Sequence, residues 1–164
     1  MLRTYLAGKM SNRYVVDVKS ERADATKALA KYNIHSVDPA AAESKLWGTH
    51  KYAKISTKFR RKVMLAMVNQ DLWLIRRCDC LIVLTGDGCS EGTQTEMLYA
   101  KSIGIPVVVV APERYRGTLM GWNNITIPED HIFPDVESAA RFIHRRYGKA
   151  YEEPYRFWLP ATRG

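Results

Sequence analysis

The sequence predicts an α/β fold, a single domain built on a doubly wound, parallel sheet of five strands. Short apolar segments alternate with longer segments of helical periodicity, and this order places helices on both faces of a parallel sheet. Cys80–Leu84 contains no charged residue and is apolar throughout, which is typical of a strand covered on both faces. With 164 residues, the chain is long enough for one domain with its own core.

Five segments are predicted to form the strands of this sheet, each bounded by turn-forming residues. The first strand ends at Gly8, and Asp38-Pro39 follows the second. Ligands of such sheets bind beyond the carboxyl ends of the strands, so the loops after the first and third strands are expected to converge. The predicted strands are Arg3–Ala7, His35–Val37, Cys80–Leu84, Pro106–Ala111 and either Ile125–Ile127 or Ile132–Phe133.

Four segments have the periodicity or the end signals of helices. The last begins after Asp135, a typical N-cap residue, and stops at Gly148. Residues 40–56 form a connection long enough to cover a site. We expect residues 1–150 to form the domain, with residues 151–164 an aromatic tail packed on it or on a partner subunit. The predicted helices are Val15–Tyr32, Thr57–Arg77, Gly92–Ile103 and Asp135–Tyr147.

The composition is that of a globular domain with an excess of basic residues. The formal net charge is +8, with denser basic groups at Lys58–Lys62, Arg76–Arg77 and Arg145–Arg146. An anionic partner, a nucleotide or a nucleic acid, suits this charge, although a solvated surface explains many of the same residues equally well.

Two further features bear on location and metal binding. No apolar run approaches the roughly 20 residues that span a bilayer, and the apolar part of the N-terminal segment is too short for a signal peptide, so we expect a cytoplasmic protein. The three cysteines, Cys78, Cys80 and Cys89, lack the spacing of a zinc site. We expect them to be buried thiols.

The segment from Asp79 to Glu96 carries the strongest functional signal. It is predicted to be a buried strand, a Gly-rich turn and the start of a helix, and it contains Ser90 near the helix start. A helix N-terminus offers unpaired N–H groups and a partial positive charge, which together bind phosphate. Ser90 is also a favoured N-cap, and the two roles are compatible.

Two carboxylic acids are candidates for catalysis. Glu96 near a helix N-terminus is stabilised as the anion, and an ionised carboxylate can attack an anomeric carbon. Its alternative role is to complement the helix dipole or pair with a lysine. Asp71 falls on the apolar stripe of Phe59, Val63, Met67 and Leu74, where burial would raise its pKa and suit it to protonate a leaving base. Asp71 bonded to a backbone amide or an arginine remains equally possible.

The end of the first strand adds two candidates. The Tyr5 hydroxyl would lie near the crevice, and Gly8 would allow close approach of the backbone to a ligand. A core tyrosine and a turn glycine are the alternatives. The glycines of this chain form neither a Walker A loop nor a GxGxxG motif.

In combination, these motifs resemble the nucleoside 2-deoxyribosyltransferase superfamily over roughly residues 3–110. The resemblance implies a flavodoxin-like (Rossmann-like) fold, cleavage of N-glycosidic bonds without a metal or redox cofactor, and at least a homodimer. It also implies that Glu96 is the nucleophile, Asp71 the acid that assists the base, and Tyr5 the side chain that positions the nucleophile. The matching segments are Tyr5-Leu-Ala-Gly8, helical Asp71, the strand after Cys78-Asp79, Gly92-Thr-x-x-Glu96 with Ala100, and Gly104-Ile-Pro-Val.

The substrate prediction depends on the residue six positions before Glu96. Superfamily transferases that act on free nucleosides carry Asp there, whereas this chain has Ser90 and so resembles the Rcl-type nucleotide hydrolases and the cytidylate hydrolases. A carboxylate would repel a 5′-phosphate and a hydroxyl would accept it, so we expect a nucleoside 5′-monophosphate. The candidate phosphate or sugar contacts are Gly8, Lys9, Met10, Ser11, Asn12, Ser90, Gly92 and Thr93.

The prediction is therefore an enzyme that cleaves the N-glycosidic bond of a (deoxy)nucleoside 5′-monophosphate through a glycosyl-glutamate intermediate, by hydrolysis or sugar transfer. The Gly92-Thr-x-x-Glu96 motif also resembles that of the LOG-type phosphoribohydrolases, whose second motif with an arginine is not evident. Two alternatives belong to other classes. One is a nucleotide-binding or sensing module without turnover, and the other is a nucleic-acid-binding protein that uses the basic groups at residues 58–62 and 141–146.

Overall fold

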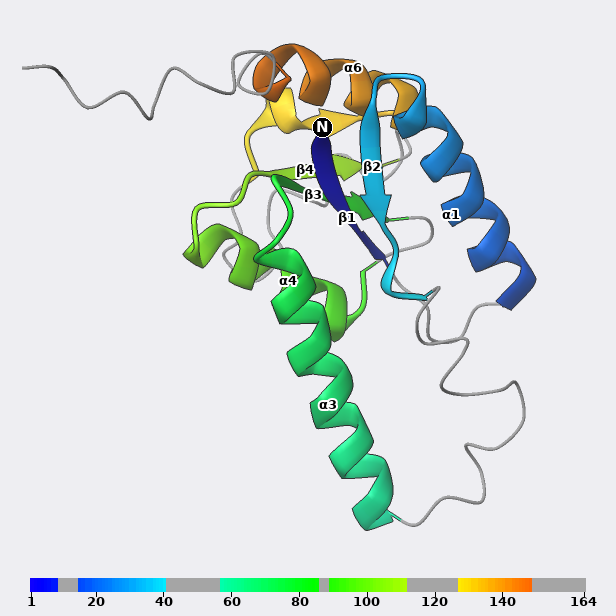
Figure 1. Ribbon diagram of the computed structural model, residues 1–164, viewed down its shortest axis with the longest axis vertical. Helices are drawn as coiled ribbons and strands as arrows, with labels where there is room; N and C mark the ends of the chain where they lie inside the picture. Colours follow the sequence, from blue (N-terminus) through cyan, green and yellow to red (C-terminus); the bar gives the residue numbers. More distant parts are fainter. Residues whose placement is uncertain (9–14, 41–56, 86–88, 112–126, 149–164) are drawn as a thin grey trace, which may run out of the picture.

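A computed structural model describes residues 1–8, 15–40, 57–85, 89–111 and 127–148. Its five strands form one parallel sheet in the order β2-β1-β3-β4-β5 (Figure 1), so the predicted fold class is confirmed. This strand order is that of flavodoxin-like folds. The strands are β1 (Leu2–Gly8), β2 (Ile34–Val37), β3 (Cys80–Leu84), β4 (Val107–Val110) and β5 (Ile132–Phe133).

Helices cover both faces of the sheet (Figure 1). Successive side chains of a strand point to opposite faces, and the core divides accordingly. Tyr5 and Ala7 of β1 pack on the side of α3 and α4, whereas Leu2 and Leu6 pack on the side of α1 and α6. The helices are α1 (Val15–Ala30), α3 (Thr57–Ile75), α4 (Glu91–Ser102) and α6 (Val136–Tyr147), with a 3-10 turn, η3, at Glu129–His131.

The observed ends of the elements lie within two residues of the predicted ones, and β3 has the predicted bounds. The first helix stops at Ala30 instead of Tyr32, because Asn33 takes a left-handed conformation with φ 56° and turns the chain into β2. The second helix stops at Ile75 instead of Arg77. Of the two segments predicted for the fifth strand, Ile132–Phe133 forms it.

Two helix starts are capped as their sequences indicate. The Ser90 side chain accepts a hydrogen bond from the Thr93 N–H at the start of α4, and the Asp135 side chain accepts one from the Ser138 N–H at the start of α6. Such caps satisfy N–H groups that have no partner within the helix. Because α4 follows β3, the Ser90 cap lies just beyond the carboxyl end of the sheet, on the side where ligands bind in folds of this type.

The predicted tail of residues 151–164 lies outside the described residues, as does all of the predicted connection of residues 40–56 except Ala40.

Candidate active site

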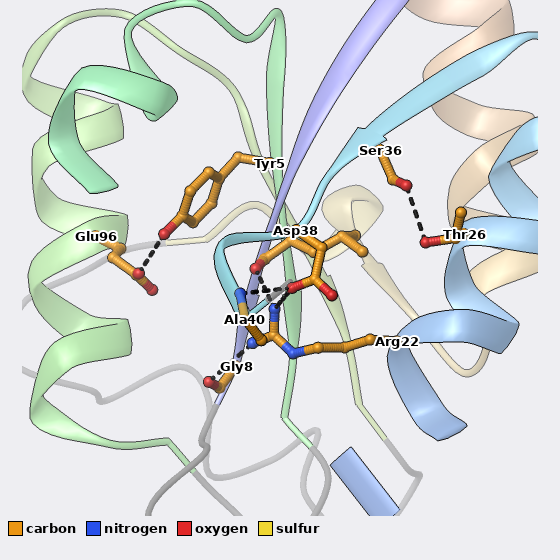
Figure 2. Close-up of polar contacts among 9 residues, drawn as sticks. Tyr5, Gly8, Arg22, Thr26, Ser36, Asp38, Ala40 and Glu96 are labelled. Carbon is orange, nitrogen blue, oxygen red and sulfur yellow. Dashed lines mark hydrogen bonds and ion pairs between the residues drawn. The ribbon is translucent and has the colours of Figure 1, made fainter. Parts of the chain in front are cut away.

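The site begins with a hydrogen bond between Tyr5 of β1 and Glu96 of α4. The Tyr5 hydroxyl donates to Glu96 Oε1 at 2.7 Å (Figure 2), and the phenol ring is buried. In the sheet, β2 lies on one side of β1, and β3, which leads into α4, lies on the other side of β1. The bond between Tyr5 and Glu96 therefore spans the point where the strand order reverses, which is where doubly wound sheets bind their ligands.

Asp71 of α3 joins the same phenol from a second helix. Burial raises the pKa of this half-buried carboxyl group to about 6, while its hydrogen-bonding interaction with Tyr5 and the charge of Arg22 act in the opposite direction. A raised pKa is what its place on the apolar stripe of α3 leads one to expect. Asp71 and Glu96 come from positions 25 residues apart in the chain, the difference between 71 and 96, and the structure brings both to Tyr5.

Tyr5 is held in its neutral, donating form. Burial raises the pKa of its hydroxyl, and the nearby charges of Glu96 and Asp71 raise that pKa further, because a phenolate beside two carboxylates would be repelled. The hydroxyl has one proton, which it donates to Glu96. Its oxygen can therefore act only as an acceptor toward Asp71 when Asp71 is protonated. The cluster thus combines a carboxyl group that accepts a hydrogen bond, a fixed donor, and an acid whose burial raises its pKa to about 6.

Cys89, which precedes the cap of α4, remains a thiol beside this cluster. Burial and the charge of Glu96 raise its pKa to about 12, and thiolate chemistry requires the opposite shift. All three cysteines are free; Cys78 and Cys80 are buried, as the sequence analysis predicts, whereas Cys89 is only partly buried.

At the start of α4, the capping interactions join two of the predicted phosphate contacts, Ser90 and Thr93. Ser90 Oγ accepts from the Thr93 N–H at 3.2 Å and lies 3.0 Å from Thr93 Oγ1. Thr93 is buried, whereas Gly92 is exposed. Ser90 is half-buried, and its hydroxyl retains one proton that can be donated to Thr93 or to a ligand.

Gly8 ends β1 in tight contact with β3. A Cβ at this position would lie 2.8 Å from the Leu84 carbonyl oxygen, a distance that requires the backbone to shift. The absence of a side chain at Gly8 is therefore required by the packing of the sheet itself. The next predicted contacts, Lys9, Met10, Ser11 and Asn12, lie outside the described residues.

Sequence reasoning missed one residue of this region, Arg22 of α1. Its side chain is only 4% exposed and is hydrogen-bonded at the carboxyl ends of β1 and β2 (Figure 2). A signal was present in the sequence. Arg22 occupies the buried stripe that Val18, Ala25 and Leu29 form along α1, and a charged side chain on such a stripe is rarely buried without partners.

Within the described residues, no three His, Cys, Asp or Glu side chains are grouped so that they could hold a metal ion. Among the described helices, none is both long and apolar enough to cross a membrane.

The family model "Domain of unknown function (DUF4406)" matches residues 2–109, and the chain belongs to this family. A comparison with the curated proteins gives no match.

The chain is similar to several solved structures. A conserved protein from Enterococcus faecalis V583 aligns with 18% identity and a TM-score of 0.55, over 89% of this chain and 99% of that chain. The chain is also similar to a 2-deoxyribosyltransferase from Bacillus psychrosaccharolyticus, with 19% identity, a TM-score of 0.48, and 84% and 90% coverage of this chain and that chain. A CMP N-glycosidase from Clostridium botulinum aligns with 18% identity and a TM-score of 0.43, covering 87% and 98% respectively.

Proposed function

We propose that this protein cleaves the N-glycosidic bond of a (deoxy)nucleoside 5′-monophosphate through a covalent ester between the sugar and Glu96. The observation that carries the proposal is the convergence of Glu96 and Asp71 on the Tyr5 hydroxyl at the switch point of the sheet. Two carboxyl groups in different surroundings, one a carboxylate and one an acid, are what glycoside cleavage with retention uses.

In the first step, a carboxylate oxygen of Glu96 attacks C1′ of the sugar. The new C1′–O bond forms as the C1′–N bond breaks, and the electron pair of the broken bond leaves with the base. Asp71 supplies the proton that neutralises this base, directly or through a water, because its raised pKa keeps it protonated to about pH 6. The hydrogen bond from Tyr5 orients the Glu96 carboxylate for the attack.

In the second step, Asp71 is ionised and accepts a proton from a water molecule that attacks C1′. The C1′–O bond to Glu96 breaks, the carboxylate is regenerated, and the sugar phosphate leaves with its original anomeric configuration. A second nucleobase in place of this water gives sugar transfer instead of hydrolysis.

The 5′-phosphate is assigned to the start of α4, where Ser90 and the first N–H groups of the helix present donors. The net charge of +8 favours an anionic substrate. Ser90→Asp places a carboxylate at this position, so we expect the ratio of activity on the nucleotide to activity on the nucleoside to fall by about tenfold or more. An unchanged ratio would argue against phosphate binding at Ser90.

The decisive test is release of free base, measured by chromatography, from a panel of ribo- and deoxyribonucleoside monophosphates. Glu96→Ala should reduce this release by about a thousandfold or more, since it removes the nucleophile. Glu91→Gln is the matched control, because Glu91 is an exposed acid in the first turn of the same helix. Full activity in the Glu96→Ala variant would end the proposal.

A nucleotide-binding module without turnover is the second candidate, favoured by the capped start of α4 at the switch point. It predicts that a monophosphate binds in calorimetry while the panel releases no base. Release of base by the wild-type protein, lost in Glu96→Ala, would exclude it.

We also propose that the protein is a cytoplasmic homodimer whose subunits meet along α3. Met64, Leu65 and Val68 lie on one side of this helix; they are large apolar side chains, and all three are exposed. Exposed apolar patches of this kind mark interaction sites, and a second copy of the chain is the partner that a closed, symmetric assembly requires.

A further inference from the structure

Thr93 carries a buried hydroxyl group in the first turn of α4. The residue is only 2% exposed, so its hydroxyl has almost no access to water. A buried O–H group that finds no acceptor loses the hydrogen bond it makes to water in the unfolded chain, and this loss costs more than one ordinary hydrogen bond contributes. The partner of Thr93 Oγ1 therefore decides where its proton goes.

That partner is Ser90. Among the described residues, Thr93 Oγ1 has one hydrogen-bond partner, Ser90 Oγ at 3.0 Å, and by distance alone either oxygen could be the donor. Their surroundings differ, because Thr93 is buried whereas Ser90 is half-buried. If Ser90 were the donor, the proton of Thr93 would have no acceptor in the core, whereas water or a ligand can accept the proton of Ser90. Thr93 is therefore the donor.

The Ser90 oxygen then has both of its acceptor positions filled. It accepts from the Thr93 N–H at 3.2 Å and from the Thr93 hydroxyl at 3.0 Å. A serine hydroxyl offers two lone pairs and one proton, so only the proton is left for a ligand. Toward any ligand, Ser90 is thus a donor only. Such a group favours an ionised acceptor, because hydrogen bonds to ionised oxygens are roughly twice as strong as those to neutral ones.

Thr93 also lies midway between the two groups to which the proposed function assigns the substrate. Ser90, assigned to the 5′-phosphate, is three positions before it, and Glu96, assigned to C1′ of the sugar, is three positions after it. Positions three apart are neighbours on the surface of a helix. Glu96 is fixed from outside the helix by the Tyr5 hydroxyl, and Ser90 is fixed from within it by Thr93.

We propose that Thr93 is a positioning residue, whose hydroxyl holds Ser90 as a donor and thereby makes the site select the 5′-phosphate of a nucleotide over the 5′-hydroxyl of a nucleoside. This inference rests on the proposed function, because it concerns the substrate of that same site. Thr93 acts through Ser90 and does not touch the ligand.

Thr93→Val tests this role, because it removes the hydroxyl and keeps a side chain of nearly the same shape. Ser90 then regains a free acceptor position, and its proton is no longer directed to the ligand. We expect the ratio of kcat/KM for the nucleotide to kcat/KM for the nucleoside to fall by about threefold to tenfold, mainly through KM for the nucleotide. A purely structural role of Thr93 would change the two substrates alike.

Three further variants separate positioning from folding. Thr93→Ser keeps the hydroxyl and should retain most of the wild-type ratio. Ser90→Ala removes the donor itself and should lower the ratio by about tenfold to a hundredfold, the usual cost of a lost hydrogen bond to a charged group. Thr95→Val is the matched control, because Thr95 is an exposed residue of the same helix whose hydroxyl donates to the Glu91 carbonyl oxygen.

The double variant Ser90→Ala/Thr93→Val gives two independent readouts. Its substrate ratio should equal that of Ser90→Ala, because Thr93 acts only through Ser90. Its urea midpoint should lie above that of Ser90→Ala, because the single variant leaves the buried Thr93 proton without an acceptor and valine removes that proton. The second readout needs no substrate, so it tests the direction of the hydrogen bond by itself. A midpoint that falls further in the double variant would contradict this direction.

The outcomes distinguish this inference from the proposed function. If the wild type releases base and Thr93→Val leaves the ratio unchanged, or if the effects of Ser90→Ala and Thr93→Val add, the positioning role is overturned and the proposed function stands. If the wild type releases no base, the proposed function fails, and calorimetry with the same nucleoside monophosphates decides the inference. A Kd weaker by about threefold or more in Thr93→Val supports positioning, whereas equal affinity, or no binding by the wild type, overturns it.

Discussion

Asp71 and Glu96 carry the same functional group in different surroundings. Asp71 reaches Tyr5 from the apolar stripe of α3, and its burial favours the neutral acid. Glu96, the sixth residue of α4, accepts a hydrogen bond from the Tyr5 hydroxyl, and such a bond favours the carboxylate form. In the proposed mechanism, this difference makes Asp71 the acid that protonates the base and Glu96 the nucleophile.

The Asp71 assignment makes a prediction about pH. With a pKa raised to about 6, Asp71 loses its proton as the pH rises through 6, so a reaction that needs the acid should slow by about tenfold per pH unit above that value. We expect kcat for base release, measured between about pH 5 and pH 8, to show this decline. Asp24→Asn, a change at an exposed acid of α1, should leave the profile unchanged.

Asp71→Asn identifies the group responsible for the decline. The substrate phosphate also titrates near pH 6, so a wild-type profile alone is ambiguous. Asp71→Asn should lower kcat by about a hundredfold or more and remove the decline from what remains. A decline that persists in this variant belongs to the substrate and contradicts the role of Asp71.

The roles at this scale were accessible from sequence to different degrees. Asp71 is visible in the sequence as an exception, an acid on an otherwise apolar stripe, and Glu96 is visible as an acid near the start of a predicted helix. Arg22 is an exception of the same kind as Asp71, but its hydrogen-bond partners depend on where β2 ends relative to β1. That register is a tertiary property, and no local pattern encodes it.

At the scale of elements, alternating apolar segments predict the sheet and its helices because each strand is buried on both faces. The ends are less predictable, since partners far along the chain fix them. Tyr32, placed in the first helix by its sequence, instead bonds Glu137 at 3.1 Å across to α6. Convergence of the loops after β1 and β3 follows from topology alone, which is why sequence reasoning could place Tyr5 and Glu96 together.

The contact between β1 and β3 gives a prediction about stability. In Gly8→Ala, the new Cβ would lie 2.8 Å from the Leu84 carbonyl oxygen, so one strand must shift. We expect the free energy of unfolding to fall by about 1–3 kcal/mol, as for other overpacked sites, measured by urea denaturation.

Gly92→Ala is the matched control for that change. A Cβ there meets only Ser90 Oγ, at 3.7 Å, and alanine is the better helix former. This variant should be as stable as the wild type or slightly more so. Equal stability of the Gly8→Ala and Gly92→Ala variants would show that the end of β1 has room to adjust.

At the scale of the whole molecule, α3 is the element least explained by the single chain. Figure 1 shows α3 extending away from the sheet, and Met64, Leu65 and Val68 near the middle of this helix are exposed. Helical periodicity in the sequence predicts a helix but does not reveal which of its faces the same chain covers. A subunit interface accounts for a helix that is apolar on an exposed face.

The predicted dimer can be tested with one substitution that introduces a charge on α3. Val68→Lys should convert a dimer to a monomer, because an ammonium group would be buried at the interface without a partner. Sedimentation velocity measures the change, and Ala23→Lys on the exposed side of α1 is the control. A wild-type chain that sediments as a monomer would contradict the interface.

The central claim is that the sugar is transiently bonded to Glu96, and intact-protein mass spectrometry tests it most directly. In a 2′-fluoro-2′-deoxyarabinonucleoside 5′-monophosphate, fluorine slows both steps because it destabilises the positive charge that develops at C1′. A good leaving base keeps the first step fast enough for the glycosyl-enzyme to accumulate. We predict that the wild-type protein gains the mass of the fluorosugar phosphate, on the peptide that contains Glu96, with release of one equivalent of base. Release of base with no added mass, or the same adduct in Glu96→Ala, would contradict the account.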